Sequence, residues 1–311
     1  VSCGSRIQVC PTGAMIDRWS SYLGHEVKFD STKTICVACS IGCGIEVFSR
    51  DNNLVRIDGD WDKPISSGVL CDLGRFKPMV EKCDRIFTPM VRKNGTLKAA
   101  TWEDALSAAA SGLKSAKPKI AALISTRQPV ESLHLFKQLF ADKLSAELVT
   151  TLEEGAKTAL LASSADELGK PFESKLEELK SSDAVLVVAD DLVLEHQVAG
   201  FFIKRNLPKG TSLVVVDAVT NKLGKLANKN LNPSSGSFED VFVGLSAAVA
   251  KLGLAKSKKN ISAETLSKAA AATGLATEDF LDAAFLLASA TNPVIVMPAK
   301  RSHLLCAISL L

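Results

Sequence analysis

Cysteines are concentrated near the beginning of this chain, and their spacing constrains its fold more than any other feature. Six of the eight cysteines lie within the first 71 of 311 residues. Cys36, Cys39 and Cys43 follow a C-x2-C-x3-C pattern, and Cys71 completes a set of four after a longer gap. Disulfide scaffolds are usually much shorter chains, so this clustering indicates metal ligands rather than disulfides.

Four thiolates are the ligand set of a [4Fe–4S] cluster, which takes one cysteine for each iron. Three of the sulfurs come from one short loop, where Gly42 and Gly44 beside Cys43 allow the backbone to turn closely. A structural zinc ion also takes four cysteines, but usually from two C-x2-C pairs, and only one such pair occurs here. The spacing therefore favours an iron–sulfur cluster, with zinc or unligated thiols as the alternatives.

The pattern of apolar residues changes along the chain and predicts an α/β fold. Short alternating strands surround the cysteines and predict a small β-rich domain. From about Thr101 onward, nearly continuous apolar runs alternate with helical patterns, as is typical of strands buried on both faces. The runs lie at residues 119–125, 147–150, 184–189, 212–216 and 294–297. This alternation predicts a doubly wound, mostly parallel sheet with right-handed crossovers.

Charge and hydropathy exclude several classes of partner. The 37 basic side chains are nearly balanced by 34 acidic ones, which leaves a formal net charge of +3. We therefore expect neither nucleic-acid binding nor a polybasic membrane-binding face. No apolar run approaches the roughly 20 residues that span a bilayer, and no signal-peptide pattern is present. The chain begins at Val1 without an initiator methionine and ends on the apolar run 304–311, so we interpret it as a piece of a longer polypeptide.

Three segments around the four cysteines carry a family resemblance. Residues 34–45, 68–76 and 102–106 resemble the 4Fe–4S Mo/W bis-MGD-type domain of the molybdopterin oxidoreductase superfamily and its junction with the next domain. That superfamily includes formate dehydrogenase alpha subunits and the large iron–sulfur subunit of complex I. The resemblance implies a [4Fe–4S] cluster on Cys36, Cys39, Cys43 and Cys71. It also implies a cluster domain at 31–88 and an incomplete molybdopterin oxidoreductase-like α/β domain at 89–311.

The first residues resemble the second half of a two-cluster ferredoxin module, whose pattern is C-x2-C-x2-C-x3-C-P. Cys3 matches the second cysteine and Cys10, before Pro11, matches the fourth, while Arg6 stands in place of the third. Arginine has no lone pair to offer iron, so it is no ligand. The resemblance implies that residues 1–30 end a ferredoxin-like module, with Cys3 and Cys10 as candidate ligands. Further [4Fe–4S] clusters are then expected in the part of the module that precedes this chain.

Three departures from the catalytic members bear on a molybdenum or tungsten pterin cofactor. Leu73 stands where those enzymes commonly carry a lysine, and residues 150–156 lack the cysteine or selenocysteine that binds the metal. The run 184–189 leads into Asp190 and Asp191, whose carboxylates would repel a pyrophosphate. Asp217 matches a family acid that faces guanine, although an acid supporting a turn is the stronger interpretation. We therefore favour a sheet without the cofactor and keep bound Mo/W-bis-MGD as the alternative.

These features predict an iron–sulfur electron-transfer subunit of an NADH-, formate- or hydrogen-linked oxidoreductase complex. Arg56 and Arg75 are the nearest cations expected to favour the reduced cluster. The resemblance implies other iron–sulfur or flavin subunits as partners and a cytoplasmic location, free or at the edge of a membrane complex. One alternative is a catalytic molybdenum or tungsten subunit of the formate dehydrogenase type. Another is a scaffold whose cluster is structural and redox-inert.

Overall fold

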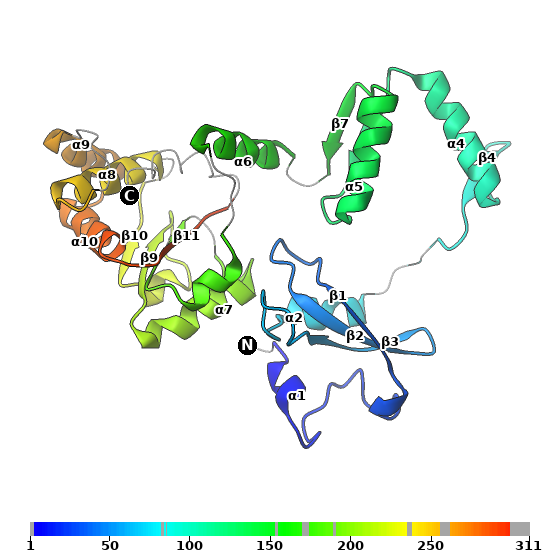
Figure 1. Cartoon of the computed structure of the whole chain (residues 1–311), viewed down its shortest axis with the longest axis horizontal. Helices are drawn as coiled ribbons and strands as arrows, with labels where there is room; N and C mark the ends of the chain where they lie inside the picture. Colours follow the sequence, from blue (N-terminus) through cyan, green and yellow to red (C-terminus); the bar gives the residue numbers. More distant parts are fainter. Residues whose placement is uncertain are drawn as a thin grey trace. The chain divides into compact units, whose positions relative to one another are not determined.

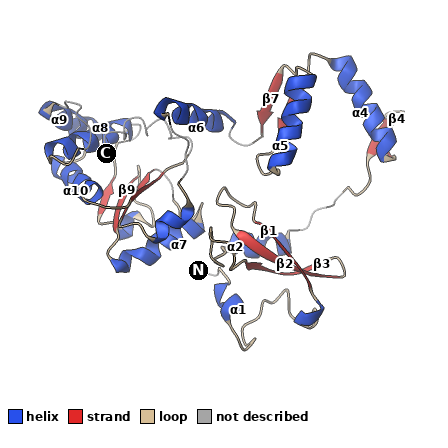
Figure 2. Cartoon of the chain, viewed as in Figure 1, coloured by secondary structure: helices blue, strands red, loops and turns tan. Residues whose placement is uncertain are grey.

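The chain divides into two units in a computed structural model. Figures 1 and 2 show its helices and strands. The first unit joins residues 1–80 to residues 160–311, and the second comprises residues 81–159. The structure describes residues 3–81, 84, 86–152, 155–169, 174–188, 191–234, 238–255 and 262–298. Val1, Asp190, residues 153–154 and the run 304–311, which the sequence analysis singled out, lie outside this set.

An antiparallel sheet of three strands, in the order β1-β2-β3, forms the β-rich part of the first unit. Asp51 and Asn52 connect β2 to β3 with φ angles of 50° and 60°, a left-handed turn that Asp and Asn tolerate well. Short helices precede and follow the sheet. The elements are α1 (Ser5–Val9), η1 (Glu26–Lys28), β1 (Asp30–Ile35), β2 (Gly44–Arg50), β3 (Asn53–Gly59), α2 (Asp72–Arg75) and α3 (Lys77–Val80).

A parallel sheet in the order β10-β9-β8-β11 forms the α/β part of the same unit. Its strands are β8 (Ala184–Val188), β9 (Ser212–Val216), β10 (Lys229–Leu231) and β11 (Pro293–Val296). The helices around it are η3 (Leu176–Lys180), α7 (Gln197–Asn206), η4 (Leu207–Lys209), η5 (Gly224–Leu226), α8 (Phe238–Lys251), α9 (Ala263–Thr273) and α10 (Thr277–Ala288). Every residue of β8 is buried, which explains its uninterrupted apolar sequence.

The two faces of this parallel sheet pack against different partners. Leu186 and Val214 belong to a cluster with Phe242 of α8 and Phe280 of α10. Val187 and Val215 face the other way, into a cluster with α7, Leu70 and Cys43. Side chains alternate across a strand, so one strand serves both clusters. The cysteine-bearing part thus shares a hydrophobic core with the parallel sheet.

The second unit contains a hairpin, a parallel strand pair and helices. Thr101 caps its first helix by accepting a hydrogen bond from the Asp104 N–H at 3.2 Å. The elements are β4 (Met90–Lys93), β5 (Thr96–Ala99), α4 (Trp102–Ala116), β6 (Ala121–Ile124), α5 (Val130–Lys137), the π-helical turn η2 (Gln138–Lys143) and β7 (Leu148–Thr151). Helix α6 (Gly155–Leu168) spans the boundary between the units.

The predicted α/β class with parallel strands is confirmed. The five apolar runs all contain strands, but these are divided between two sheets: β6 pairs with β7, and the others join β10. None of the described helices has the length and apolar character of a membrane span.

Candidate metal centre

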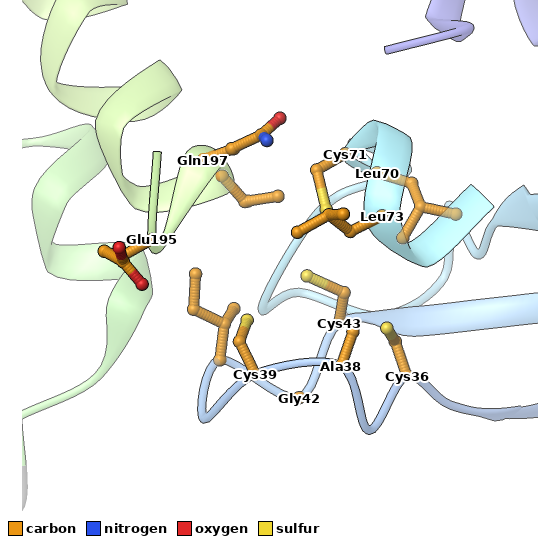
Figure 3. A pocket seen from close by; sticks show the side chains of 12 residues that line it. Cys36, Ala38, Cys39, Gly42, Cys43, Leu70, Cys71, Leu73, Glu195 and Gln197 are labelled. Atoms are coloured by element: carbon orange, nitrogen blue, oxygen red, sulfur yellow. The ribbon is translucent and has the colours of Figure 1, made fainter. Parts of the chain in front are cut away.

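Four cysteines from two separate segments line one pocket of the first unit (Figure 3). Cys36, Cys39 and Cys43 belong to the loop between β1 and β2, and Cys71 immediately precedes α2. We call this site the cysteine pocket. Its other lining residues are Ala38, Ile41, Gly42, Leu70, Leu73, Glu195, Gln197 and Val198. In Figure 3 the three loop thiols point toward the segment that carries Cys71.

Backbone contacts explain how the loop presents its three thiols. The Cys36 N–H donates a hydrogen bond to the Cys43 carbonyl at 2.8 Å, which closes the loop at its base. Gly42 has a φ of +67°, a left-handed conformation that favours glycine and turns the chain back toward β2. On the opposite side, a methyl group added at Gly74 would lie 3.0 Å from Cys36 Sγ. Helix α2 therefore approaches the loop as closely as a glycine allows.

Three thiols of the cysteine pocket, those of Cys36, Cys43 and Cys71, resist ionisation. Burial raises the pKa of Cys43 to about 12, and the nearby Cys39, Cys36 and Cys71 add to this shift through charge repulsion. Burial also raises the pKa values of Cys36 and Cys71. Thiolates in such a site need a nearby cation, and a coordinated metal supplies that charge.

The chemistry of this donor set fits a [4Fe–4S] cluster. Such a cluster requires four thiolates distributed around it, one at each iron. The cysteine pocket offers four thiols, three of them on one loop and one from the facing segment. Among the residues that the structure describes, no three His, Cys, Asp or Glu side chains are grouped as ligands of a single metal ion.

The other two candidate ligands, Cys3 and Cys10, flank α1 and are not among the residues lining the cysteine pocket. The Cys10 thiol lies 3.4 Å from the Thr12 hydroxyl, and this hydrogen bond, together with backbone N–H groups within residues 12–15, lowers the pKa of Cys10 to about 7. Burial opposes ionisation of Cys3, but hydrogen bonds to Ser5 and the charge of Arg75 bring its pKa below the usual value. Neighbouring polar and charged groups thus favour ionisation of both thiols.

The two arginines that were expected to favour a reduced cluster share one acidic partner. Arg75 Nη1 donates to Asp58 Oδ1 at 2.6 Å, and Arg56 Nε lies 2.7 Å from Asp58 Oδ2. Arg56 also pairs with Glu26 at 2.7 Å. Two carboxylates therefore balance the two guanidinium groups, which weakens their combined effect on any charge in the cysteine pocket.

Glu195, Gln197 and Val198 were not predicted from the sequence, yet they line the cysteine pocket. Glu195 lies between β8 and α7, and Gln197 and Val198 begin α7, so all three lie beyond the carboxyl end of a parallel strand. Open α/β sheets usually bind their ligands at that edge. This rule is the one sequence signal that could have identified these three residues, because their spacing matches no metal-ligand motif.

Comparison with known sequences identifies the family. Residues 85–296 match the family described as molybdopterin oxidoreductase, and residues 29–80 match the molybdopterin oxidoreductase Fe4S4 domain. The chain belongs to the molybdopterin oxidoreductase family. The resemblance expected from the cysteine motif is therefore confirmed, and the Fe4S4 match supports a [4Fe–4S] cluster in this chain.

Several curated proteins are similar in sequence to this chain. Subunit 3 of NADH-quinone oxidoreductase from Thermus thermophilus is 33% identical over 60% of this chain and 23% of its own length. The alpha subunit of NADPH-Fe(3+) oxidoreductase from Geobacter sulfurreducens is 28% identical over 96% of this chain and 37% of its own length. This chain therefore spans about a quarter to two-fifths of these curated relatives.

A solved structure shows the same fold. Acetylene hydratase from Pelobacter acetylenicus matches with a TM-score of 0.65 and 16% identity, over 87% of this chain and 40% of that one. At this identity the likeness concerns the fold.

Two aspartates that the sequence analysis weighed in connection with a pterin cofactor take part in local contacts. Asp191 accepts a hydrogen bond from the Val193 N–H at 3.1 Å, within the turn after β8. Asp217, at the end of β9, accepts a hydrogen bond from the Asn221 side chain at 3.0 Å. Leu73 lines the cysteine pocket itself. An acid that supports a turn accounts for both aspartates.

Proposed function

We propose that this chain is the cluster-binding part of an electron-transfer subunit, with Cys36, Cys39, Cys43 and Cys71 as the ligands of a [4Fe–4S] cluster. The observation that carries this proposal is the convergence of four thiols, from two distant segments, on one pocket. A [4Fe–4S] cluster supplies reversible one-electron transfer. We further propose that residues 31–88 form the cluster domain and that residues 1–30 end a ferredoxin-like module, in which Cys3 and Cys10 are candidate ligands.

The residues around the thiols would set the reduction potential. The Ala38 N–H faces the sulfur of Cys36, and the N–H groups of Leu73 and Gly74 face that of Cys71. Hydrogen bonds to cluster sulfur stabilise the more negative, reduced state. Leu70 and Leu73 limit the access of water, while the Glu195 carboxylate acts in the opposite sense to the N–H groups.

The partners of such a subunit would be other iron–sulfur or flavin subunits of an NADH-, formate- or hydrogen-linked complex. Two relatives are subunits by name, one of NADH-quinone oxidoreductase and one of NADPH-Fe(3+) oxidoreductase, and this supports the proposal.

A catalytic molybdenum or tungsten subunit is the second candidate. Family membership favours it, and the alpha subunit of F420-dependent formate dehydrogenase 2 from Methanococcus maripaludis is 26% identical over 86% of this chain. Leu73 and the locally bonded Asp217 favour the electron-transfer role instead. Metal analysis of the full-length protein separates the two, since stoichiometric molybdenum or tungsten would overturn our preference.

Iron analysis of matched loop variants tests the ligand assignment. Cys39→Ser removes one thiolate, whereas Ser40→Ala changes the neighbouring side chain and leaves every thiol in place. We expect Cys39→Ser to lose the electron paramagnetic resonance signal of this centre and about four irons, and Ser40→Ala to retain both. An unchanged iron content in Cys39→Ser, or zinc in place of iron in the unaltered protein, would refute the assignment. A centre that cannot be reduced reversibly in a redox titration would indicate a structural scaffold.

A further inference from the structure

Arg75 lies at the end of α2 and is almost completely buried, with 2% of its surface exposed. Its backbone N–H donates to the Cys71 carbonyl at 3.1 Å, so it belongs to the same helical turn as the fourth thiol. Helix α2 contains only four residues. A helix of this length has no independent stability, and its position depends on what its side chains contact.

The Arg75 guanidinium joins α2 to two other parts of the first unit. Nη1 donates to Asp58 Oδ1 at 2.6 Å and to the Ile57 carbonyl at 3.0 Å, both on β3. Nε donates to the Cys3 carbonyl at 3.1 Å, and Nη2 donates to Gln8 Oε1 at 2.6 Å. Half of these four bonds therefore go to residues 3–10, which we call the N-terminal segment.

The N-terminal segment is itself attached to β3. The Gln8 side chain donates to the Gly59 carbonyl at 2.6 Å and accepts from the Gly59 N–H at 3.0 Å. Gln8 thus occupies the strand edge as a further strand would, while the same oxygen accepts from Arg75. Removal of these contacts would leave guanidinium N–H groups buried without acceptors, an unfavourable state that α2 relieves by moving.

We propose that Arg75 is a positioning residue for Cys71: the N-terminal segment holds Arg75, and Arg75 holds the turn that places the fourth thiol. This inference rests on the proposed cluster ligands. The three loop thiols are placed separately, by the β1–β2 pairing and the bond from the Cys36 N–H to the Cys43 carbonyl. Loss of Arg75 or of its N-terminal contacts therefore weakens one corner of the cluster, the one bound by Cys71.

The full-length protein with Arg75→Met tests this selectivity, because methionine fills similar space without any donor. Outer-shell partners of metal ligands typically change metal affinity by 10- to 100-fold, so we expect the fourth iron to be held about 10- to 100-fold more weakly. Treatment with ferricyanide, which accepts one electron, would release this iron as Fe2+ from a [4Fe–4S]2+ cluster and leave a [3Fe–4S]+ centre with its own electron paramagnetic resonance signal. Arg75→Lys keeps the charge but not the planar fork, and we expect only partial recovery.

Two further variants distinguish positioning from general damage. Arg56→Met removes the other cation of Asp58, and the contacts of Arg56 are to Asp58, Glu26 and the Phe48 ring rather than to α2 or the N-terminal segment. We expect it to retain the four-iron centre. Gln8→Ala removes the acceptor of Nη2 and the two Gly59 bonds of Gln8, but it leaves the Arg75 bonds to β3 and Cys3 in place, so it should produce a smaller fraction of the three-iron form.

The outcomes separate this inference from the proposed function. Three-iron signals in Arg75→Met and Gln8→Ala, but not in Arg56→Met, would support it. Unchanged four-iron centres in Arg75→Met and Gln8→Ala would overturn it, as would the same signal in Arg56→Met. If Arg75→Met does not fold, Gln8→Ala decides. The proposed function fails differently, because the unaltered protein would then lack the centre or Cys71→Ser would retain it.

Discussion

The cysteine pocket and the N-terminal segment both carry thiols in spacings typical of iron–sulfur proteins, but they place these thiols in opposite environments. In the cysteine pocket, burial and mutual repulsion raise the pKa of Cys43 to about 12. In the N-terminal segment, hydrogen bonds from the Thr12 hydroxyl and nearby backbone N–H groups lower the pKa of Cys10 to about 7. Motif spacing is similar in the two regions, whereas the cost of forming a thiolate differs greatly.

This difference has a physical consequence for metal binding. A thiol that ionises only with a cation beside it couples its deprotonation to metal binding, so an empty site stays neutral. A thiol with a pKa near 7 is already about half thiolate at neutral pH without a metal beside it, and this free thiolate is a nucleophile. In the cysteine pocket, ionisation of the thiols is therefore coupled to cluster binding. In the N-terminal segment, Cys10 ionises near neutral pH without that coupling.

Ligand removal should give the largest contrast between the two regions. We expect Cys43→Ser to abolish the [4Fe–4S] centre, because one thiolate per iron is required and Cys43 is the most buried of the four. Cys10→Ser should leave this centre intact. Iron content and electron paramagnetic resonance of the full-length variants measure the effect. Equal losses in both variants would show that the two regions form one cooperative site.

Alkylation of the metal-free protein should reveal the two pKa values directly. Iodoacetamide attacks the thiolate, so Cys10 should reach half its maximal rate near pH 7 and lose reactivity as the pH falls below this value. Cys43, with a pKa of about 12, should still be gaining reactivity at pH 10. At pH 7 its thiolate fraction is about one part in 10⁵. Mass spectrometry of the labelled peptides gives both profiles, and similar midpoints would contradict the comparison.

The cysteine loop of the pocket could be predicted from the sequence, whereas the lining residues at the start of α7 could not. The C-x2-C-x3-C spacing and Gly42 define a tight loop through short-range sterics, and the structure has that loop between β1 and β2. Residues 184–188 form the expected buried strand, because a strand covered on both faces needs apolar side chains at every position. Glu195 and Gln197 reach the pocket only through the packing of α7 into one hydrophobic cluster with Cys43 and Leu70, which no local pattern encodes.

The contacts of Arg75 also could not be predicted from the sequence. The sequence predicts a cation close to a cluster, but it does not predict that the fold buries this cation against Asp58 and the N-terminal segment. A long side chain can reach acceptors on several elements, and the choice among them is made by tertiary structure. The division of the predicted sheet into β6–β7 and the four strands around β8 has the same origin, since apolar runs identify strands but not their neighbours.

Packing at Gly74 should produce an intermediate effect that is confined to the cysteine pocket. A Cβ there would lie 2.8 Å from Leu70 Cδ1, so Gly74→Ala should lower the free energy of unfolding by about 1–3 kcal/mol. In a Leu70→Ala background the same change should cost less, because its nearest neighbour is gone. Urea unfolding of the metal-free single and double variants measures this coupling. If the changes in the free energy of unfolding were additive, the packing of Gly74 against Leu70 would contribute nothing to the effect.

The hydroxyl of Thr12 should account for the smallest effect, at the N-terminal segment alone. Thr12→Val keeps the shape of the side chain but removes the largest cause of the lowered pKa of Cys10. We expect this pKa to rise toward the ordinary value of about 8.5, which slows alkylation at pH 7 severalfold and leaves the rate at pH 10 nearly unchanged. The direction follows from linkage, because the lost hydrogen bond stabilised the thiolate rather than the thiol. Reactivity of Cys43 serves as the internal control, and a parallel change there would mean that the two regions are not electrostatically independent.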